Sequence, residues 1–195
     1  MQRFLDIVLS FVALIMLVPI LLPVVLILKF TGEGEIFFIQ NRIGRNGMTF
    51  GLLKFATMLK DSPNLGTETI TIKNDPRILP FGKFLRKTKI NELPQLINIF
   101  LGQMSIVGPR PLTLQTFGMY SEDVQNEVVR VKPGLSGIGS IMFRSEEEIL
   151  NRGTESNAIY RDLIAPYKGV LEMWFIENCG LCVYLKCIVT TIIVV

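Results

Sequence analysis

Residues 17–30, LVPILLPVVLILKF, close an apolar stretch that begins at Phe4. Between Phe4 and Phe30 the only charged residues are Asp6 and Lys29. As a straight helix the stretch would be about 40 Å long, longer than a hydrocarbon core of about 30 Å. A cleavable signal peptide fits poorly, because the apolar core is too long and no small-x-small cleavage site follows it. The stretch therefore predicts a helix that enters a membrane.

Two prolines, Pro19 and Pro23, lie inside this apolar stretch. Because proline has no N–H, neither can donate a hydrogen bond to the carbonyl four residues earlier, and each ring crowds the preceding turn. Two such defects so close together predict a strong bend. Basic residues flank the stretch on both sides, so the charge distribution does not decide between a helix that crosses the bilayer and one that enters and turns back.

The composition is that of a membrane-associated protein with one domain of ordinary size. The chain has 195 residues, 49% of them hydrophobic and 19% charged, with a mean hydropathy of +0.44. A typical soluble protein has about 25% charged residues. The net charge of +3 is too small to indicate a nucleic-acid binder.

Histidine and cysteine usage exclude several kinds of site. The chain contains no histidine, which rules out histidine-dependent triads, metal ligands and general bases. Its three cysteines gather near the C-terminus, and CGLC (179–182) has no second CxxC pair. We therefore expect thiols that pack against protein or lipid, in a reducing compartment.

The rest of the chain predicts a mostly α fold with a small β-hairpin (α+β), in which residues 31–195 form a compact domain on the membrane surface and residues 1–30 form the membrane helix. The patterns IFFIQ (36–40) and TFGLLKF (49–55) indicate two strands joined by a turn-prone segment. Residues 181–195 are too short to span and are expected to lie in the interface or on the first helix. Helices are expected over 75–88 with Asp75 as N-cap, 91–100, 121–131 with Ser121 as N-cap, and 156–178.

Residues 77–89 carry five basic side chains and no acidic one, with apolar residues between them. Such a segment suits an anionic membrane surface, although a helix with a solvated basic face has the same pattern.

Six stretches, in this order, carry a resemblance: QNRIG (40–44), LLKFATM (52–58), NDPR (74–77), FLRKTKINELPQL (84–96), MSIVGPRPL (104–112) and VKPGLSGI (131–138). Together they resemble the bacterial sugar transferase family, the small monotopic phosphoglycosyl transferases. Each stretch alone is a weak signal, but six at compatible spacing over nearly the whole chain are specific.

The resemblance implies a reaction and a location. Family members transfer a sugar 1-phosphate from a nucleotide diphosphate-sugar, usually a UDP-sugar, to polyprenyl (undecaprenyl) phosphate with Mg²⁺, and UMP leaves. The product starts the assembly of a surface glycan. Their N-terminal helix is a re-entrant hairpin broken at a proline, so the domain would lie on the cytoplasmic face of the bacterial inner membrane. A homodimer is one alternative for the assembly.

The resemblance also implies roles for individual residues. Asn91 and Glu92 occupy the positions of the catalytic dyad, and Glu92 would be the essential carboxylate and the Mg²⁺ ligand. The other candidates bind phosphates or form the pocket. Arg110, Arg42 and Lys54 would contact phosphates, Pro109 and Pro111 would frame Arg110, Arg86 and Lys87 would contact phosphate or lipid headgroups, and Gln95 would either contact substrate or pack.

Three residues depart from the family pattern by removing a charge. Asn91 replaces the usual nucleophilic aspartate, Ala56 a basic residue and Gln103 an aspartate. A neutral amide is a poor nucleophile. Four explanations stay open: Glu92 or another carboxylate is the nucleophile, the lipid phosphate attacks directly, the chain is an impaired relative that binds lipid phosphate or partner enzymes, or these residues are substitutions that trap a ligand. Asp75 and Asp162 could supply a missing charge, or could be a helix cap and a solvated helix residue.

Overall fold

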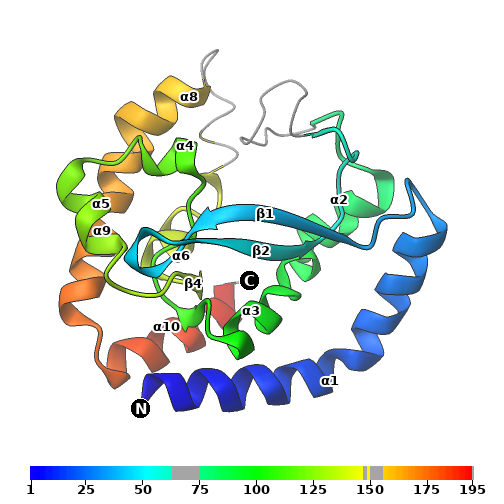
Figure 1. Cartoon of the computed structure of the whole chain (residues 1–195), viewed down its shortest axis with the longest axis horizontal. Helices are drawn as coiled ribbons and strands as arrows, with labels where there is room; N and C mark the ends of the chain where they lie inside the picture. The colour runs from blue at the N-terminus through cyan, green and yellow to red at the C-terminus, as the bar shows by residue number, and fades with distance from the viewer. Residues whose placement is uncertain (63–74, 147–148, 150–155, 195) are drawn as a thin grey trace.

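The computed structural model describes residues 1–62, 75–146, 149 and 156–194, and the structural statements below concern these residues. The chain is mostly helical with one β-hairpin, as predicted. The hairpin lies in the middle of the molecule, and helices surround it (Figure 1).

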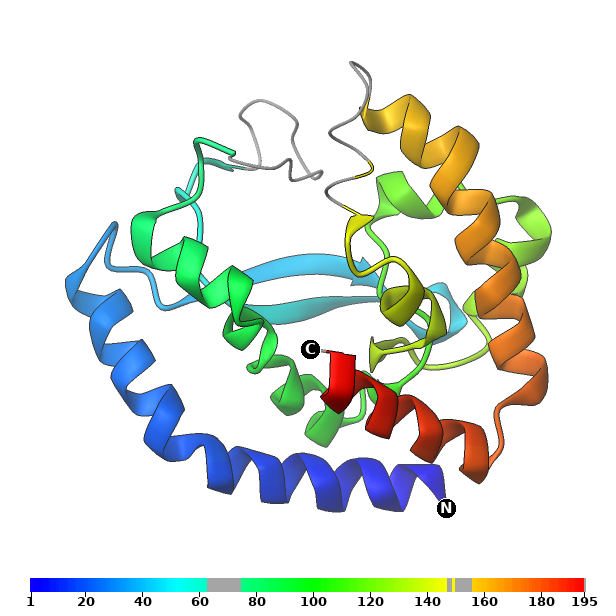
Figure 2. The same cartoon turned by 180° about the vertical axis from the view of Figure 1, so that it is seen from behind.

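The N-terminal helix α1 (Gln2–Phe30) curves around one side of the molecule (Figures 1 and 2). It continues through Pro19 and Pro23, so the prolines do not divide it into two helices. They remove two hydrogen bonds from the ladder, which accounts for a bend in the axis. Among the described residues α1 is the helix long and apolar enough to cross a membrane.

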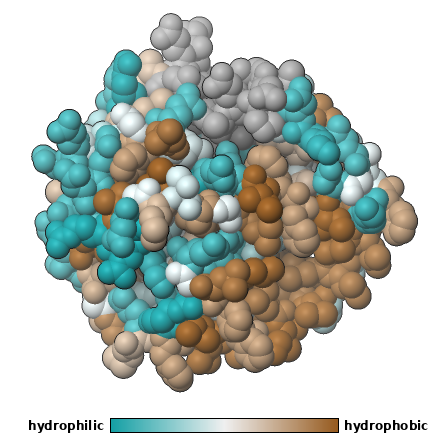
Figure 3. All heavy atoms as spheres, viewed as in Figure 1, coloured by the Kyte–Doolittle hydropathy of each residue, from teal (hydrophilic) through white to brown (hydrophobic). Residues whose placement is uncertain are grey.

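The two faces of α1 have different surroundings. The inner face packs against the domain, and its buried residues are Asp6, Ser10, Val24 and Leu28. The outer face exposes large apolar side chains, which form much of the brown surface at the lower right of Figure 3. Because water is a poor solvent for such a face, it is suited to lipid. Examples from along the helix are Phe4, Phe11, Ile15, Met16, Leu22 and Leu26.

The hairpin consists of the antiparallel strands β1 (Phe37–Ile43) and β2 (Thr49–Phe55). A short 3₁₀ turn, η1 (Arg45–Gly47), joins them. The first strand is longer than predicted, because residues 41–43, assigned to the turn from sequence, pair with residues 49–51.

Helix α2 (Pro80–Lys87) begins later than predicted, with Pro80 in its first turn, where the missing N–H costs nothing. Asp75 is therefore not its N-cap, and that prediction is wrong. Instead the buried Asp75 carboxylate accepts a hydrogen bond from the backbone N–H of Arg77, at 3.0 Å, and forms an ion pair with its guanidinium at 2.6 Å.

The predicted helix 91–100 is two elements, the 3₁₀ turn η3 (Ile90–Glu92) and the helix α3 (Gln95–Leu101). Pro94 is the N-cap of α3, because proline fits the start of a helix and not its interior. Leu96 and Ile99 are buried against the hairpin and α1, whereas Ile97 and Phe100 are exposed.

A short parallel pair follows, β3 (Ser105–Val107) with β4 (Gly134–Ser136), and β4 lies within the stretch VKPGLSGI (131–138). Ser121 is at the N-cap of α5 as predicted, but its side chain makes no capping hydrogen bond, and α5 ends before residue 131. The helices of this region are α4 (Leu114–Phe117), α5 (Glu122–Val128) and α6 (Ile138–Met142).

The predicted helix 156–178 is present as three consecutive helical segments, α8 (Ser156–Ile159), the π-turn η4 (Tyr160–Ile164) and α9 (Ala165–Asn178). The last helix, α10 (Leu181–Val194), packs against β3, β4 and α6. It also contacts the first helix as expected, because Tyr184 donates a hydrogen bond to Asp6 at 2.7 Å.

Candidate active site

One face of the hairpin supplies the first group of site residues. Side chains two apart on a strand share a face, and directly paired residues share it across the ladder. Gln40 pairs with Leu52, so Arg42 and Lys54 point to the same side. The guanidinium of Arg42 donates to the Gln40 amide oxygen at 2.6 Å and to the Pro111 carbonyl at 3.0 Å. Arg42 is thereby fixed between its own strand and the neighbouring loop.

Glu92 and Gln95 lie on η3 and α3, which both pack against β2. Glu92 ends η3, and Gln95 is the first residue of α3. Asn98 ties this helix to β2, because its side chain accepts from the Leu53 N–H at 3.0 Å and donates to the Gly51 carbonyl at 2.8 Å. The carboxylate of Glu92 is therefore carried on a turn that is fixed relative to the strand of Lys54.

Arg110 lies in a loop whose backbone is held by close-packed glycines. A Cβ on Gly134 would lie 2.1 Å from the Gly108 nitrogen, and one on Gly137 would lie 2.2 Å from the Gly108 oxygen. Only glycine permits this approach. The Gly134 N–H donates to the Pro109 carbonyl at 2.8 Å. These contacts account for the glycines in the stretches that contain GPRP and KPGLSG.

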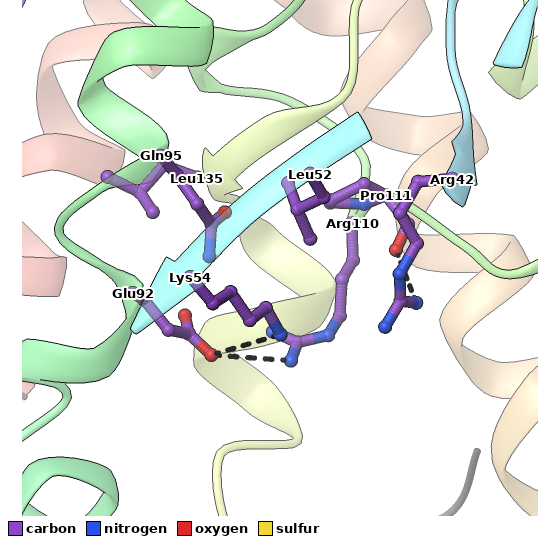
Figure 4. Close-up of a pocket in the computed structure, with 8 residues that line it drawn as sticks. All are labelled: Arg42, Leu52, Lys54, Glu92, Gln95, Arg110, Pro111 and Leu135. Carbon is purple, nitrogen blue, oxygen red and sulfur yellow. Dashed lines mark hydrogen bonds and ion pairs between the residues drawn. The ribbon is translucent and has the colours of Figure 1, made fainter. Parts of the chain in front are cut away.

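These segments meet in one pocket, lined by Arg42, Leu52, Lys54, Glu92, Gln95, Arg110, Pro111 and Leu135. Figure 4 shows the ends of Lys54 and Arg110 converging on the Glu92 carboxylate. Glu92 Oε1 lies 4.0 Å from Lys54 Nζ and 3.8 Å from Arg110 Nη2. Both distances exceed those of a direct hydrogen bond, so the three charges surround a space rather than closing on one another.

The charges in the pocket shift one another's ionisation. Burial opposes the ionised form of Glu92, but Lys54 and Arg110, with Lys89 and Arg86, outweigh it and hold the pKa of Glu92 below its usual 4.5. Glu92 is therefore a carboxylate at neutral pH.

Burial has the opposite consequence for the basic residues. It lowers the pKa of Lys54 to about 7, although Glu92 opposes the shift. Burial, assisted by Arg110, also lowers the pKa of Arg42 to about 10. The site holds more positive charge than one carboxylate can balance, which is an arrangement suited to an anion such as a diphosphate.

A family model described as bacterial sugar transferase matches residues 1–195. The chain belongs to the bacterial sugar transferase family. Its relatives include exopolysaccharide production protein ExoY of Sinorhizobium fredii, which is 36% identical over 189 residues, or 87% of this chain and 83% of that protein.

Longer relatives match this sugar transferase over a part of their length. Undecaprenyl-phosphate glucose phosphotransferase of Komagataeibacter xylinus is 33% identical over 98% of this chain and 35% of that protein. UDP-glucose:undecaprenyl-phosphate glucose-1-phosphate transferase of Escherichia coli is 37% identical over 78% of this chain and 33% of that protein. The chain spans about a third of the length of these two relatives.

Most of the predicted site residues of the sugar transferase come together in the pocket, and four do not line it. Asn91 and Pro109 directly precede the lining residues Glu92 and Arg110. Arg86, on α2, acts on the pocket through its charge, because it contributes to the pKa shifts of Glu92 and Lys54. Lys87 is exposed at the end of α2.

Asn91 is 6% exposed, and its Oδ1 has no hydrogen-bond partner in the described part of the chain. The other two departures lie outside the lining of the pocket. Gln103 accepts a hydrogen bond from Asn98 at 2.7 Å, and neither it nor the buried Ala56 lines the pocket. Asp75 does not line the pocket and forms an ion pair with Arg77. Asp162 is a solvated helix residue, as one alternative predicted, and pairs with Arg161.

Sequence analysis missed the support behind Arg110. Glu172, on α9, is 3% exposed, and its pKa is raised to about 7 by burial, opposed by the Arg110 backbone and by Lys168. Lys168 is itself buried and forms an ion pair with Glu146. Nothing in the sequence signals this group, because the segments that form it are far apart along the chain.

Proposed function

We propose that this sugar transferase moves a sugar 1-phosphate from a nucleotide diphosphate-sugar, a UDP-sugar, to polyprenyl phosphate, releasing UMP and starting the assembly of a surface glycan. The observation that carries the proposal is the Glu92 carboxylate held between Lys54 and Arg110 in a pocket that Arg42 also lines. Cations placed around a diphosphate stabilise the charge that develops as the bond between its phosphates breaks. The names of the relatives support the same substrates.

The bond changes define what the site must do. The bond between the sugar-bearing phosphorus and the bridging oxygen breaks, and UMP leaves with that oxygen. A new bond forms from the same phosphorus to an oxygen of polyprenyl phosphate. Glu92 is the single carboxylate among the lining residues, so a covalent phospho-sugar intermediate, if formed, would be carried by it. UMP released without polyprenyl phosphate, in an amount equal to the enzyme, would indicate this route. Its absence would indicate direct attack by the lipid phosphate.

Mg²⁺ is part of the proposal. The described residues contain no group of three His, Cys, Asp or Glu side chains that could hold a metal by themselves. Mg²⁺ is commonly bound through one or two carboxylates together with substrate phosphates and water. Glu92 fits that mode together with the neighbouring Asn91 Oδ1, which has no hydrogen-bond partner among the described residues. When bound, the ion would neutralise part of the diphosphate charge.

We also propose that α1 enters the cytoplasmic leaflet of the bacterial inner membrane and returns to the same side. The exposed apolar face of α1, its two internal prolines and the cytosolic origin of nucleotide-sugars support this topology. The test is to replace the natural cysteines by serine, place single cysteines at position 2 and in loop 31–35, and label intact cells from outside. Protection of both positions is expected, and labelling of one alone would establish a span.

The assay that tests the activity is UMP release from a panel of UDP-sugars with polyprenyl phosphate and Mg²⁺, run on this sequence and on Asn91→Asp side by side. Turnover by the natural sequence, lost in Glu92→Gln, is the expected result. If Asn91→Asp alone turns over, the chain is the impaired relative that its amide suggests, and a lipid-phosphate binding assay replaces the activity assay. The oligomeric state is a separate question: the mass of the protein in bicelles would show whether two copies form a homodimer.

A further inference from the structure

The first turns of α1 contain a buried carboxylate that an apolar membrane helix does not need for insertion. Asp6 is 3% exposed. Its Oδ1 accepts three hydrogen bonds, from the Ser105 hydroxyl at 2.9 Å, the Ile106 N–H at 2.9 Å and the Tyr184 hydroxyl at 2.7 Å. A buried carboxylate is costly unless it is satisfied in this way. An apolar residue would have packed at lower cost in free energy. The hydrogen bonds of Asp6 therefore serve to fix the position of α1 relative to β3 and α10.

Arg3, one turn earlier, makes a second connection. Its guanidinium donates to the Ile99 carbonyl at 2.6 Å and to the Phe100 carbonyl at 2.7 Å. Both carbonyls belong to the last turn of α3, the negative end of that helix. The planar guanidinium can satisfy two carbonyls at once, which a lysine cannot do in the same geometry.

The two connections reach the two segments that build the pocket. Asp6 holds the start of β3, which leads directly into the loop that carries Arg110. Arg3 holds the end of α3, whose first residue, Gln95, lines the pocket close to Glu92. One turn of α1 therefore binds the end of α3 and the start of β3. The chain before α3 carries Glu92 and the loop after β3 carries Arg110, and these two side chains lie 3.8 Å apart.

We propose that Arg3 and Asp6 are positioning residues for catalysis, which hold the segments bearing Glu92 and Arg110 at their working separation and so make α1 part of the catalytic framework as well as the membrane anchor. The proposal rests on the proposed function of the pocket. A shift of about 1 Å between catalytic groups can lower turnover by a factor of about 100, even when its cause is remote. Loss of either connection should therefore act mainly on kcat.

The test uses the full chain in bicelles with Arg3→Gln, Arg3→Lys, Asp6→Leu and Tyr184→Phe. We expect kcat for UMP release to fall tenfold or more in Arg3→Gln and Asp6→Leu, with KM for the UDP-sugar within about threefold of the natural value. Arg3→Lys should restore little of the lost kcat, because lysine keeps the positive charge but cannot donate to both carbonyls as the planar guanidinium does. Tyr184→Phe should have a smaller effect, because two donors to Asp6 remain.

Two variants serve as matched controls. Ser10→Ala changes a fully buried polar residue one turn beyond Asp6, and the Ser10 hydroxyl bonds within its own helix, to the Ile7 carbonyl. Lys29→Gln removes one positive charge at the other end of α1. Both should keep kcat within twofold of the natural value. If the positioning variants lose thermal stability but keep kcat, or if the controls lose kcat equally, the proposal is overturned.

Hydrogen exchange separates this proposal from the proposed function. Asp6→Leu should speed exchange at Ile106 and along the loop that carries Arg110, and Arg3→Gln should do so along η3 and α3. These changes need no turnover. If the natural chain releases no UMP, the proposed function fails, whereas unchanged exchange in both segments would overturn the positioning role whatever the activity.

Discussion

The guanidinium of Arg110 lies 3.8 Å from the carboxylate of Glu92, and neither group is bonded directly to the other. The Arg110 side chain is 42% exposed and that of Glu92 is 19% exposed. A closed, short ion pair would have to open before a phosphate could enter, whereas this pair leaves donors free to turn toward a ligand. The separation is therefore that of a binding site rather than of a structural salt bridge.

Replacing Glu92 by Gln should reduce UMP release by about 100-fold or more, because it removes the single carboxylate among the lining residues and leaves the basic groups unbalanced. Initial rates at saturating UDP-sugar and Mg²⁺ measure the effect. Glu127→Gln, which removes a carboxylate paired with Arg130 at the surface, is the control and should keep its rate. Equal rates for Glu92→Gln and the natural protein would remove Glu92 from the mechanism.

Lys54 should take up a proton when a diphosphate binds. Its pKa is about 7 in the free protein, because burial disfavours the charged form, so at pH 8 most molecules hold it neutral. An anion in the pocket favours the charged form and raises the pKa. Calorimetry of UDP binding at pH 8, in buffers of different ionisation enthalpy, should show net proton uptake that disappears at pH 6.

The control for this measurement is a lysine outside the pocket. Lys54→Met should abolish the uptake and bind UDP more weakly, whereas Lys60→Met, at an exposed lysine paired with Glu35, should leave both unchanged. The affinity of the natural protein should fall as pH rises above 7, since the proton must then be taken from solvent. Buffer-independent binding enthalpies at pH 8 would contradict the assignment.

Sequence analysis predicted the hairpin, the long apolar N-terminal helix and most of the residues that line the pocket, because these depend on local patterns and on ordered short stretches. Arg42, Lys54 and Arg110 were named from short stretches that resemble the family, whereas the strand pairing that puts Arg42 and Lys54 on one face came from the structure. Helix boundaries were less accurate. Asp75 has the residue type of an N-cap, but the guanidinium of Arg77, two residues later, pairs with its carboxylate, and that ion pair replaces the cap.

Gly134→Ala should destabilise the protein and displace Arg110. Its new Cβ would lie 2.1 Å from the Gly108 nitrogen, and neither is a flexible side chain that could give way. We expect a loss of about 2 kcal/mol or more in the free energy of unfolding, and a fall in activity, because β4 and the loop before Arg110 must separate. Thermal unfolding in bicelles measures the loss. Gly180→Ala, where nothing lies within 4 Å of the added Cβ, is the matched control.

Three residues with structural consequences for the site were beyond sequence analysis. Asp6 is a single acidic residue inside the apolar N-terminal stretch, Arg3 directly precedes that stretch, and Glu172 lies in the segment 156–178 that was expected to be a helix. Their partners are remote along the chain: Ile99 for Arg3, Ser105 and Tyr184 for Asp6. Such contacts depend on how the helices and strands pack together, and the hydrophobic periodicity of a single segment carries no information about this packing.

Glu172 should make the stability of the protein depend on pH in a defined window. Its pKa is about 7 in the folded protein against 4.5 for the ordinary side chain, since burial disfavours the charge more than the Arg110 backbone and Lys168 favour it. Below pH 4.5 the carboxyl group is protonated in both the folded and the unfolded protein, so it does not lower the free energy of unfolding. Between pH 4.5 and 7 the unfolded chain loses its proton first, so stability is lost as pH rises.

Glu172→Gln removes this titration. The free energy of unfolding of the variant should therefore rise relative to the natural protein across that window, by up to roughly 3 kcal/mol at pH 8, and should show no such gain at pH 4. Thermal unfolding in bicelles from pH 4 to pH 8 is the measurement, with Glu122→Gln, at an exposed position on α5, as the control for loss of one carboxylate. A constant difference between variant and natural protein over that range would show that Glu172 stays ionised beside Lys168.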